Sequence, residues 1–554
     1  MTRNVFRFNK RLIGPVVTTA LVVLVAAGPA WGQPSEVLKL LASDAAAEDE
    51  FGFSVSIGGD TAVVGAPFND DDGDNSGLAY IFQRDYGGTD NWGEVHKLLA
   101  EDADEGDLFG FSVAISGDFA IVGARRNDDN GSNSGSAYIF YRNQGGTDLW
   151  GQVTKITASN AATSDSFGRS VDISGDLAVI GAPLVGSNVG AAYIFERDGA
   201  GVWNEVAILT ASDGAAADFF GLSVSISGDT ALVGADGDDD NGSLSGSAYV
   251  FVKPPGGWVN MTETAKLTPF GGAAFDFFGF SVAISIDTAV VGAIGDDSFI
   301  GSAYIFERDA GGPDKWGQTA KLTAFDGANS DEFGTSVSIR GEGVIVGAKD
   351  DGFAVGSAYL FREPPTGWQN ATENDKITAS DAAAGDEFGF FVSISGDLAI
   401  VGAHLNDDNG TSSGSAYIFD GVCPCPWDVN GDYVVDAADL LSLLVNWGSC
   451  ADCNDCPADF DDNCTVGSSD LLSLLVNWGL CPCVEGTPPL SLADELANVC
   501  LTMDHWDDFV DKMQTGTQAE KDNYLCWMIH YLDHCSRCNC VDIHTCPDDD
   551  PFDD

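Results

Sequence analysis

Residues 109–124 decide the fold and read Phe-Gly-Phe-Ser-Val-Ala-Ile-Ser-Gly-Asp-Phe-Ala-Ile-Val-Gly-Ala. The first half alternates apolar and small polar residues, as a half-buried strand does, and the second half is the apolar run of an inner strand. The Ser-Gly-Asp sequence between the halves is typical of a tight turn. The stretch therefore predicts two antiparallel strands joined by a short turn.

The same pattern recurs at intervals of 53 to 58 residues between about residues 31 and 421. The pair Phe-Gly begins at Phe51, Phe109, Phe167, Phe220, Phe278, Phe333 and Phe388. A Gly-Ala pair follows 14 residues later, at Gly65, Gly123, Gly181, Gly234, Gly292, Gly347 and Gly402. A third motif, Gly-x-Ala-Tyr, contains Tyr80, Tyr138, Tyr193, Tyr249, Tyr304, Tyr359 and Tyr417. Four short strands per repeat predict a mainly β fold, a seven-bladed β-propeller with four antiparallel strands per blade.

The two ends of the repeat region complement each other. The seventh unit stops after Tyr417-Ile-Phe-Asp, without a fourth strand, and a matching segment stands at residues 37–44 before the first Phe-Gly. We expect this N-terminal strand to complete the last blade, which removes an open sheet edge. Trp31 precedes Lys39 by eight residues, as Trp258 precedes Lys266, so Trp31 is expected to belong to the closing strand.

The first 30 residues have the pattern of a secretory signal peptide. Basic residues up to Arg11 precede a mostly apolar run from Leu12 to Ala27 and then small residues. We expect cleavage after Ala30 and a protein that is secreted, at the cell surface or periplasmic. An uncleaved anchor is the alternative, but the run is short for a membrane span. No other segment is apolar enough, so no membrane insertion is expected after cleavage.

Charge excludes one class of partner and suggests another. The chain has 85 acidic against 25 basic residues, a formal net charge of −60, which disfavours nucleic acid and anionic membranes. Antiparallel strands bring the acidic loops after each second strand and the acidic links between blades to one face. That face could collect Ca²⁺ or meet a basic partner, or its residues could simply make soluble turns. Basic residues after the third strands are expected at the opposite face, at Arg84, Arg142, Arg197 and Arg308.

The three recurring motifs resemble the FG-GAP repeats that build the propeller of integrin α-subunits. The resemblance covers about 390 residues. It has one departure, because the integrin-type calcium loop between the two motifs is replaced here by a Ser-Gly-Asp turn, as at residues 116–118. No calcium ligand of that family is therefore carried over. The resemblance implies the shorter bacterial form of the repeat, whose role is generally adhesive or unassigned.

Two segments that begin at Asp428 and Asp459, 31 residues apart, each place oxygen ligands in a loop that leads into an amphipathic helix. This pattern is typical of an EF-hand-like calcium loop, and Asp at position 12 with one helix per loop resembles a type I dockerin. The resemblance assigns to the first Ca²⁺ site Asp428, Asn430, Asp432, Val434 through its carbonyl, Asp436 and Asp439. It assigns to the second site Asp459, Asp461, Asn463, Thr465 through its carbonyl, and Asp470. Gly467 occupies position 9 of the second loop, so that site is expected to be weaker; a cohesin-like protein is the implied partner.

All 14 cysteines lie between Cys423 and Cys546. Eight fall in the dockerin-like region 422–484 and six in the Cys/His-rich region 485–554, and even numbers in an exported chain favour disulfides. In the second region Cys526, His530 and His534 would share one helix face and could hold Zn²⁺, although disulfides are the commoner outcome.

These features predict a secreted protein that is not an enzyme. The repeats contain only two histidines, His96 and His404, and no spacing typical of a catalytic triad. We expect a binding or adhesion protein whose propeller recognises an extracellular protein or glycan and whose dockerin-like module attaches it through calcium. The alternatives are an extracellular polysaccharide-acting propeller hydrolase or lyase, and a structural spacer.

Overall fold

The computed structural model describes residues 34–422, except 87, 89, 90, 314 and 365, together with residues 434–435, 440, 443, 448–449, 465–466, 474 and 479–480. The predicted signal peptide, its cleavage site and Trp31 lie outside the described residues. No helix among the described residues is long and apolar enough to cross a membrane.

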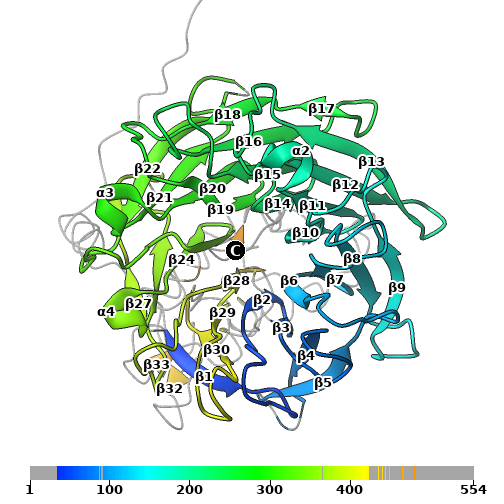
Figure 1. Cartoon of the computed structure of the whole chain (residues 1–554). Helices are drawn as coiled ribbons and strands as arrows, with labels where there is room; N and C mark the ends of the chain where they lie inside the picture. The colour runs from blue at the N-terminus through cyan, green and yellow to red at the C-terminus, as the bar shows by residue number, and fades with distance from the viewer. Residues whose placement is uncertain are drawn as a thin grey trace, which may run out of the picture. The chain divides into compact units, whose positions relative to one another are not determined.

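Residues 34–422 form seven β-sheets arranged in a ring, each with four antiparallel strands (Figure 1). Blades 1 and 2 comprise β2 (Ser54–Gly58), β3 (Thr61–Ala66), β4 (Leu78–Arg84) and β5 (Trp92–Leu98), then β6 (Phe109–Ser116), β7 (Phe119–Ala124), β8 (Ser136–Tyr141) and β9 (Gly151–Ile156). Blades 3 and 4 comprise β10 (Ser170–Ser174), β11 (Leu177–Ala182), β12 (Ala191–Arg197) and β13 (Trp203–Thr210), then β14 (Val224–Ser227), β15 (Thr230–Ala235), β16 (Ser247–Val252) and β18 (Ala265–Leu267).

The remaining blades repeat this order. Blades 5 and 6 comprise β19 (Phe278–Ser285), β20 (Thr288–Ala293), β21 (Ser302–Glu307) and β22 (Gly317–Thr323), then β23 (Ser336–Arg340), β24 (Gly343–Ala348), β25 (Ser357–Arg362) and β27 (Asp375–Ile377). Blade 7 comprises β28 (Val392–Ser395), β29 (Leu398–Ala403), β30 (Ser415–Asp420) and β1 (Ser35–Leu40). The first strand of a blade lies nearest the axis and the fourth strand at the rim (Figure 1). The predicted seven-bladed propeller is confirmed.

The ring is closed by the N-terminal strand. β1 pairs antiparallel with β30, and the two lie side by side in blue and yellow in Figure 1. Lys39 of β1 stands opposite Tyr417, as Lys97 of β5 stands opposite Tyr80 within blade 1. The segment before the first repeat is therefore the fourth strand of the last blade, as the sequence predicts.

Blades 4 and 6 differ from the others before their fourth strands. There the short strands β17 (Met261–Thr262) and β26 (Ala371–Thr372) pair in parallel with β13 and β22 of the preceding blades. In both of these blades a tryptophan precedes the lysine by eight residues, Trp258 before Lys266 and Trp368 before Lys376, rather than by the five residues seen in blades 1, 2 and 5. The longer spacing therefore provides the residues that bridge neighbouring blades.

The phenylalanine of each Phe-Gly pair fills the core of its own blade. All seven are fully buried. Each packs edge-on against a tyrosine and a phenylalanine of the third strand, with ring centroids 5.3 to 6.1 Å apart. This is the geometry that aromatic rings prefer, and it fixes the third strand relative to the start of the first.

The glycines of the two motifs bring neighbouring blades into backbone contact. A Cβ atom on Gly65 of blade 1 would lie 2.0 Å from the carbonyl oxygen of Gly110 in blade 2. The Ser54 hydroxyl donates a hydrogen bond of 2.8 Å to the same carbonyl. Between blades 7 and 1 the equivalent distance, from Gly402 to the Gly52 oxygen, is also 2.0 Å. Only glycine fits at these positions, because a methyl group would overlap the next blade.

Replacing the glycine at the closing contact should therefore destabilise the ring. We expect Gly402→Ala to lower the free energy of unfolding by about 1–3 kcal/mol, the usual cost of overpacking a tight contact. Gly199→Ala is the matched control, since nothing lies within 4 Å of a Cβ atom there. Urea denaturation of both variants measures the difference. Equal midpoints for Gly402→Ala and Gly199→Ala would contradict the packing argument.

Candidate functional site

A lysine from the fourth strand lies within the acidic loop face in six of the seven blades. In each case its ammonium group stands 5.0 to 5.7 Å from the ring centroid of the third-strand tyrosine opposite. It also pairs with carboxylates of the preceding interblade link, of the loop after the second strand, or of both. The six lysines are Lys39, Lys97, Lys155, Lys266, Lys321 and Lys376. Each lysine places a positive charge among loop carboxylates. The loop sequences by themselves show only the negative charges.

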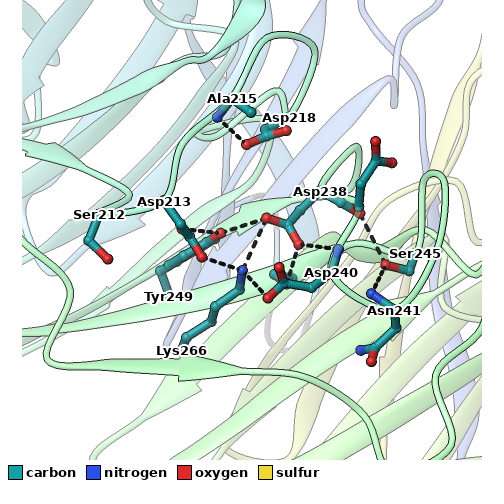
Figure 2. Close-up of polar contacts among 12 residues, drawn as sticks. Ser212, Asp213, Ala215, Asp218, Asp238, Asp240, Asn241, Ser245, Tyr249 and Lys266 are labelled. Atoms are coloured by element: carbon teal, nitrogen blue, oxygen red, sulfur yellow. Dashed lines mark hydrogen bonds and ion pairs between the residues drawn. The ribbon is translucent and has the colours of Figure 1, made fainter.

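The lysine of blade 4 pairs with three carboxylates, more than any of the other five lysines. Figure 2 shows this cluster. The Lys266 ammonium lies 2.7, 3.1 and 2.6 Å from carboxylate oxygens of Asp213, Asp238 and Asp240. Tyr249 donates hydrogen bonds of 3.1 and 3.0 Å to Asp213 and Asp238. One oxygen of each carboxylate lies within 4.8 Å of the others, an arrangement that could hold a metal ion. The Lys266 ammonium already pairs with all three.

The directions in which the pKa values of Asp213 and Lys266 shift agree with a cluster held together by charge. Burial would raise the pKa of Asp213, but the hydrogen bond and charge of Lys266 hold it below its usual value. Burial would likewise lower the pKa of Lys266, but its hydrogen bonds to Asp213, Asp240 and Asp238 raise it. Asp213 therefore contributes stability above its unfolded pKa and loses it as the pH falls through its lower folded pKa.

Blade 3 shows what happens when the cation is missing. Ile208 stands opposite Tyr193, where the other six blades have lysine. The link residue that accepts the tyrosine hydroxyl is the neutral Asn160, at 2.9 Å, and the loop helix α2 (Val185–Asn188) contains no acidic residue. The lysine and the surrounding carboxylates are thus absent together. Such matched loss indicates that the lysine compensates the carboxylates.

The opposite face carries the predicted arginines, each beside an aspartate of the turn between the first two strands. The Arg197–Asp176 and Arg308–Asp287 pairs are 3.0 Å long, and the Arg142–Asp118 and Arg84–Asp60 pairs are 3.5 and 3.8 Å long. Both faces therefore contain compensated ion pairs. The loop face is less strongly acidic than its loop sequences alone suggest.

Exposed phenylalanines replace polar residues in the loops of blades 5 and 6. The residues of this aromatic group, with their exposed fractions, are Phe270 (78%), Phe275 (52%), Phe325 (82%) and Phe353 (94%). Phe353 lies in α4 (Asp351–Ala354), the loop helix of blade 6, which neighbours α3 (Asp296–Phe299) of blade 5 along the ring (Figure 1). The position of Phe325 is serine in four other blades, and that of Phe353 is aspartate in four others.

The axial cavity is lined by the first strands. It has a volume of about 170 Å³ and is bordered by residues that directly follow Phe-Gly: Phe53, Arg169, Leu222, Phe280, Thr335 and Phe390. The lining is largely apolar. Residues of all seven first-strand regions border it, with Ser112 and Val113 representing blade 2.

The predicted calcium loops are described only in part. Val434 lies in β31 (Val434–Val435), which pairs with β34 (Gly479–Leu480), and Thr465 lies in β33 (Thr465–Val466), which pairs with β32 (Gly448–Ser449). Leu443 and Leu474, 31 residues apart, are both helical and buried. The predicted ligands outside the described residues are Asp428, Asn430, Asp432, Asp436, Asp439, Asp459, Asp461, Asn463 and Asp470. Cys526, His530 and His534 also lie outside them.

A profile of the FG-GAP repeat matches this chain seven times. The matched residues are 34–82, 92–140, 150–195, 203–251, 261–306, 316–361 and 371–419, more than half of the sequence. The chain belongs to the FG-GAP repeat family. A comparison with curated proteins found no match.

Each FG-GAP match ends on the third strand of a blade and begins at the fourth strand of the preceding blade, or, for the matches that begin at residues 261 and 371, at the short strands β17 and β26 just before it. The first match therefore begins at β1, which belongs to blade 7. The sequence motif and the structural blade are offset by one strand, and this offset is what closes the ring. Because of this offset, the link between two neighbouring blades lies inside one FG-GAP repeat.

The fourth-strand lysines and the exposed phenylalanines were not predicted from sequence. Both features can be found by comparing the seven repeats of the chain with one another. Aligning the seven FG-GAP repeats position by position places the lysine opposite tyrosine in six of them, and places Phe325 and Phe353 where other repeats have polar residues. Departures from the common repeat, rather than the repeat itself, indicate the features specific to one blade.

The compensation within blade 4 can be measured. We expect Lys266→Ile, which copies Ile208, to destabilise the protein by about 3–5 kcal/mol, because it leaves the buried Asp238 carboxylate beside two others without their cation. Adding Asp213→Asn, Asp238→Asn and Asp240→Asn should restore most of that loss. Urea denaturation at neutral pH in chelator measures both. Equal stability of the single and the quadruple variant would show that the lysine does not compensate these carboxylates.

Proposed function

We propose that this protein is a secreted, non-catalytic binding or adhesion protein. The propeller is its recognition surface for an extracellular protein or glycan. The region 422–484 is a dockerin-like module that attaches or assembles it through Ca²⁺, with a cohesin-like protein as the partner. The FG-GAP propeller fold supports a role in recognition or binding. The class of ligand and the calcium-dependent attachment are tested by the experiments below.

The observation that carries the proposal is the aromatic group on blades 5 and 6. Phe325 and Phe353 are 82% and 94% exposed, and it is unfavourable to expose large apolar side chains to water. They stand out on a chain whose surface loops are otherwise acidic, with 85 acidic residues in all. Aromatic side chains on an exposed surface are typical anchors of protein interfaces, and their faces also stack on sugar rings. The surrounding acidic loops would add specificity for a partner with complementary charge.

The calcium proposal rests on the repeated loop sequences. Asp428 to Asp439 provides carboxylate and amide oxygens at EF-hand spacing, the ligand type that Ca²⁺ prefers. The equivalent residues Leu443 and Leu474 are both buried, which supports two repeats with a shared packing pattern. Disulfides among the flanking cysteines would staple the module in an oxidising compartment.

Removing the aromatic group should weaken binding. We expect Phe325→Ser/Phe353→Ser to lower affinity at least tenfold for any ligand found by screening the full-length protein on glycan and extracellular-protein arrays, because anchor residues provide most of the binding energy. Leu149→Ser is the matched control, since Leu149 is 51% exposed in a loop on the opposite face. Unchanged binding in the double variant, or turnover of a polysaccharide by the wild type, would contradict the proposal.

The two calcium loops should differ in affinity. We expect calorimetry of the full-length protein to show a tighter Ca²⁺ site that Asp428→Ala removes and a weaker one that Asp459→Ala removes, since Gly467 contributes no ligand to the second loop. Retention of the tighter site in Asp428→Ala, or no Ca²⁺ binding by the wild type, would refute the assignment.

A further inference from the structure

Two arginines near the axis of the propeller differ from the fourth-strand lysines, which all contact carboxylates. Arg125 follows the Gly-Ala pair of blade 2, and Arg169 follows the Phe-Gly pair of the neighbouring blade 3. Within the part of the chain that the structure describes, neither arginine has a carboxylate at ion-pair distance. Both side chains are half-buried. Two adjacent blades of a chain with a net charge of −60 thus present cations that its own carboxylates do not contact.

Both guanidinium groups lie over one aromatic ring. The Cζ atoms of Arg125 and Arg169 stand 4.2 and 4.8 Å from the ring centroid of Phe111. The attraction of a cation to the face of a ring holds each group in place without neutralising its charge. The Nε atom of Arg125 is buried and has no hydrogen-bond partner. The two guanidinium groups are therefore positioned, but their capacity to donate hydrogen bonds is only partly used.

The charges of the two arginines oppose each other. Burial, followed by the charges of Arg169 and Arg126, lowers the pKa of Arg125 to about 10. Burial also lowers the pKa of Arg169 to about 10, although the charge of Asp236 acts in the opposite direction. Both groups remain charged at neutral pH. An anion bound beside them would relieve the desolvation and the mutual repulsion.

Asp236 is the carboxylate whose charge acts on Arg169, but the two residues form no ion pair. The Oδ1 atom of Asp236 is buried without a hydrogen-bond partner, and burial raises the pKa of Asp236 to about 6. An anion at Arg169 would therefore be repelled by Asp236 without having to displace it from a contact.

Arg169 borders the axial cavity, whose lining is otherwise mostly apolar. Lys349 is the other charged residue that borders it, and the Lys349 ammonium already pairs with carboxylates. No carboxylate of the described chain lines the cavity. An engineered apolar cavity of about 150 Å³ binds benzene, so a volume of about 170 Å³ accommodates a six-membered ring.

We propose that the axial cavity binds a small organic anion that consists of an apolar body and one carboxylate. The carboxylate accepts hydrogen bonds from the guanidinium group of Arg169, and the charge of Arg125 adds attraction. The apolar body fills the cavity among Phe53, Leu222 and the other apolar side chains that line it.

The chemistry of the lining favours this class of ligand. The planar guanidinium group matches a carboxylate through two parallel hydrogen bonds. Apolar walls with one charged group that fixes orientation are typical of small-molecule sites. None of the four phenylalanines of the aromatic group on blades 5 and 6 borders the cavity, so this site goes beyond the recognition surface proposed above.

Benzoate is the probe, and calorimetry of the full-length protein at neutral pH in a low-chloride buffer measures its affinity. Wild type is compared with Arg169→Gln and with the control Arg197→Gln. Arg197 lies on the opposite face beside Asp176, and its replacement removes the same charge. We expect Arg169→Gln to weaken benzoate binding about tenfold or more, since it loses charged hydrogen bonds, and Arg197→Gln to bind as the wild type does.

Two further measurements separate the charge from the cavity. Benzyl alcohol carries the same ring without the charge, and we expect it to bind wild type more weakly than benzoate does and to bind Arg169→Gln equally well. Asp236→Asn removes the repelling carboxylate and should bind benzoate more tightly than wild type. No benzoate binding by wild type at millimolar concentrations, equal benzoate affinity in Arg169→Gln and Arg197→Gln, or weaker benzoate binding by Asp236→Asn would overturn the proposal.

Discussion

The structure depends on one close backbone contact, repeated at every junction between blades. The glycine of each Gly-Ala pair lies against the carbonyl of the next Phe-Gly glycine, where an added Cβ would approach to 2.0–2.2 Å. In six blades a serine hydroxyl donates a hydrogen bond to that same carbonyl. Both motifs that define the repeat in sequence therefore meet at the junction. The contact sets the distance between neighbouring blades. The buried phenylalanines of the Phe-Gly pairs then fill the core beside each contact.

The ring closes only if the junction between blades 7 and 1 has the same geometry as the other six junctions. This geometry is possible because each sequence repeat starts one strand before its blade. Because each repeat begins on the fourth strand of the preceding blade, β1 has no blade to join except blade 7. The resulting order puts Lys39 among Tyr417, Asp381 and Asp408, the same surroundings that Lys155 has in blade 2. Closure thus completes a polar cluster on the loop face as well as a sheet.

The sequence predicts the fold well because seven copies of one pattern carry the same information. Strand order, the seven blades and the closing strand all follow from Phe-Gly, Gly-Ala and Gly-x-Ala-Tyr in register. The site features are harder to predict because they depend on contacts between positions far apart in the repeat. Lys266 meets Asp213, 53 residues away, and Arg169 meets the ring of Phe111 in the preceding blade. Acidic loops indicate negative charge, but only the register of the fourth strand shows which cation lies among them.

Amide hydrogen exchange of β1 tests the central claim, that the N-terminal strand closes the ring, most directly. Mass spectrometry of the purified protein would follow peptides that contain residues 35–40 and 415–420. The account predicts that the amides of β1 that pair with β30 are protected to the same degree as those of β5 and β9, the fourth strands of blades 1 and 2, and that β1 and β30 lose protection together in mild denaturant. Exchange of β1 at the rate of an unstructured segment, with β30 still protected, would contradict it.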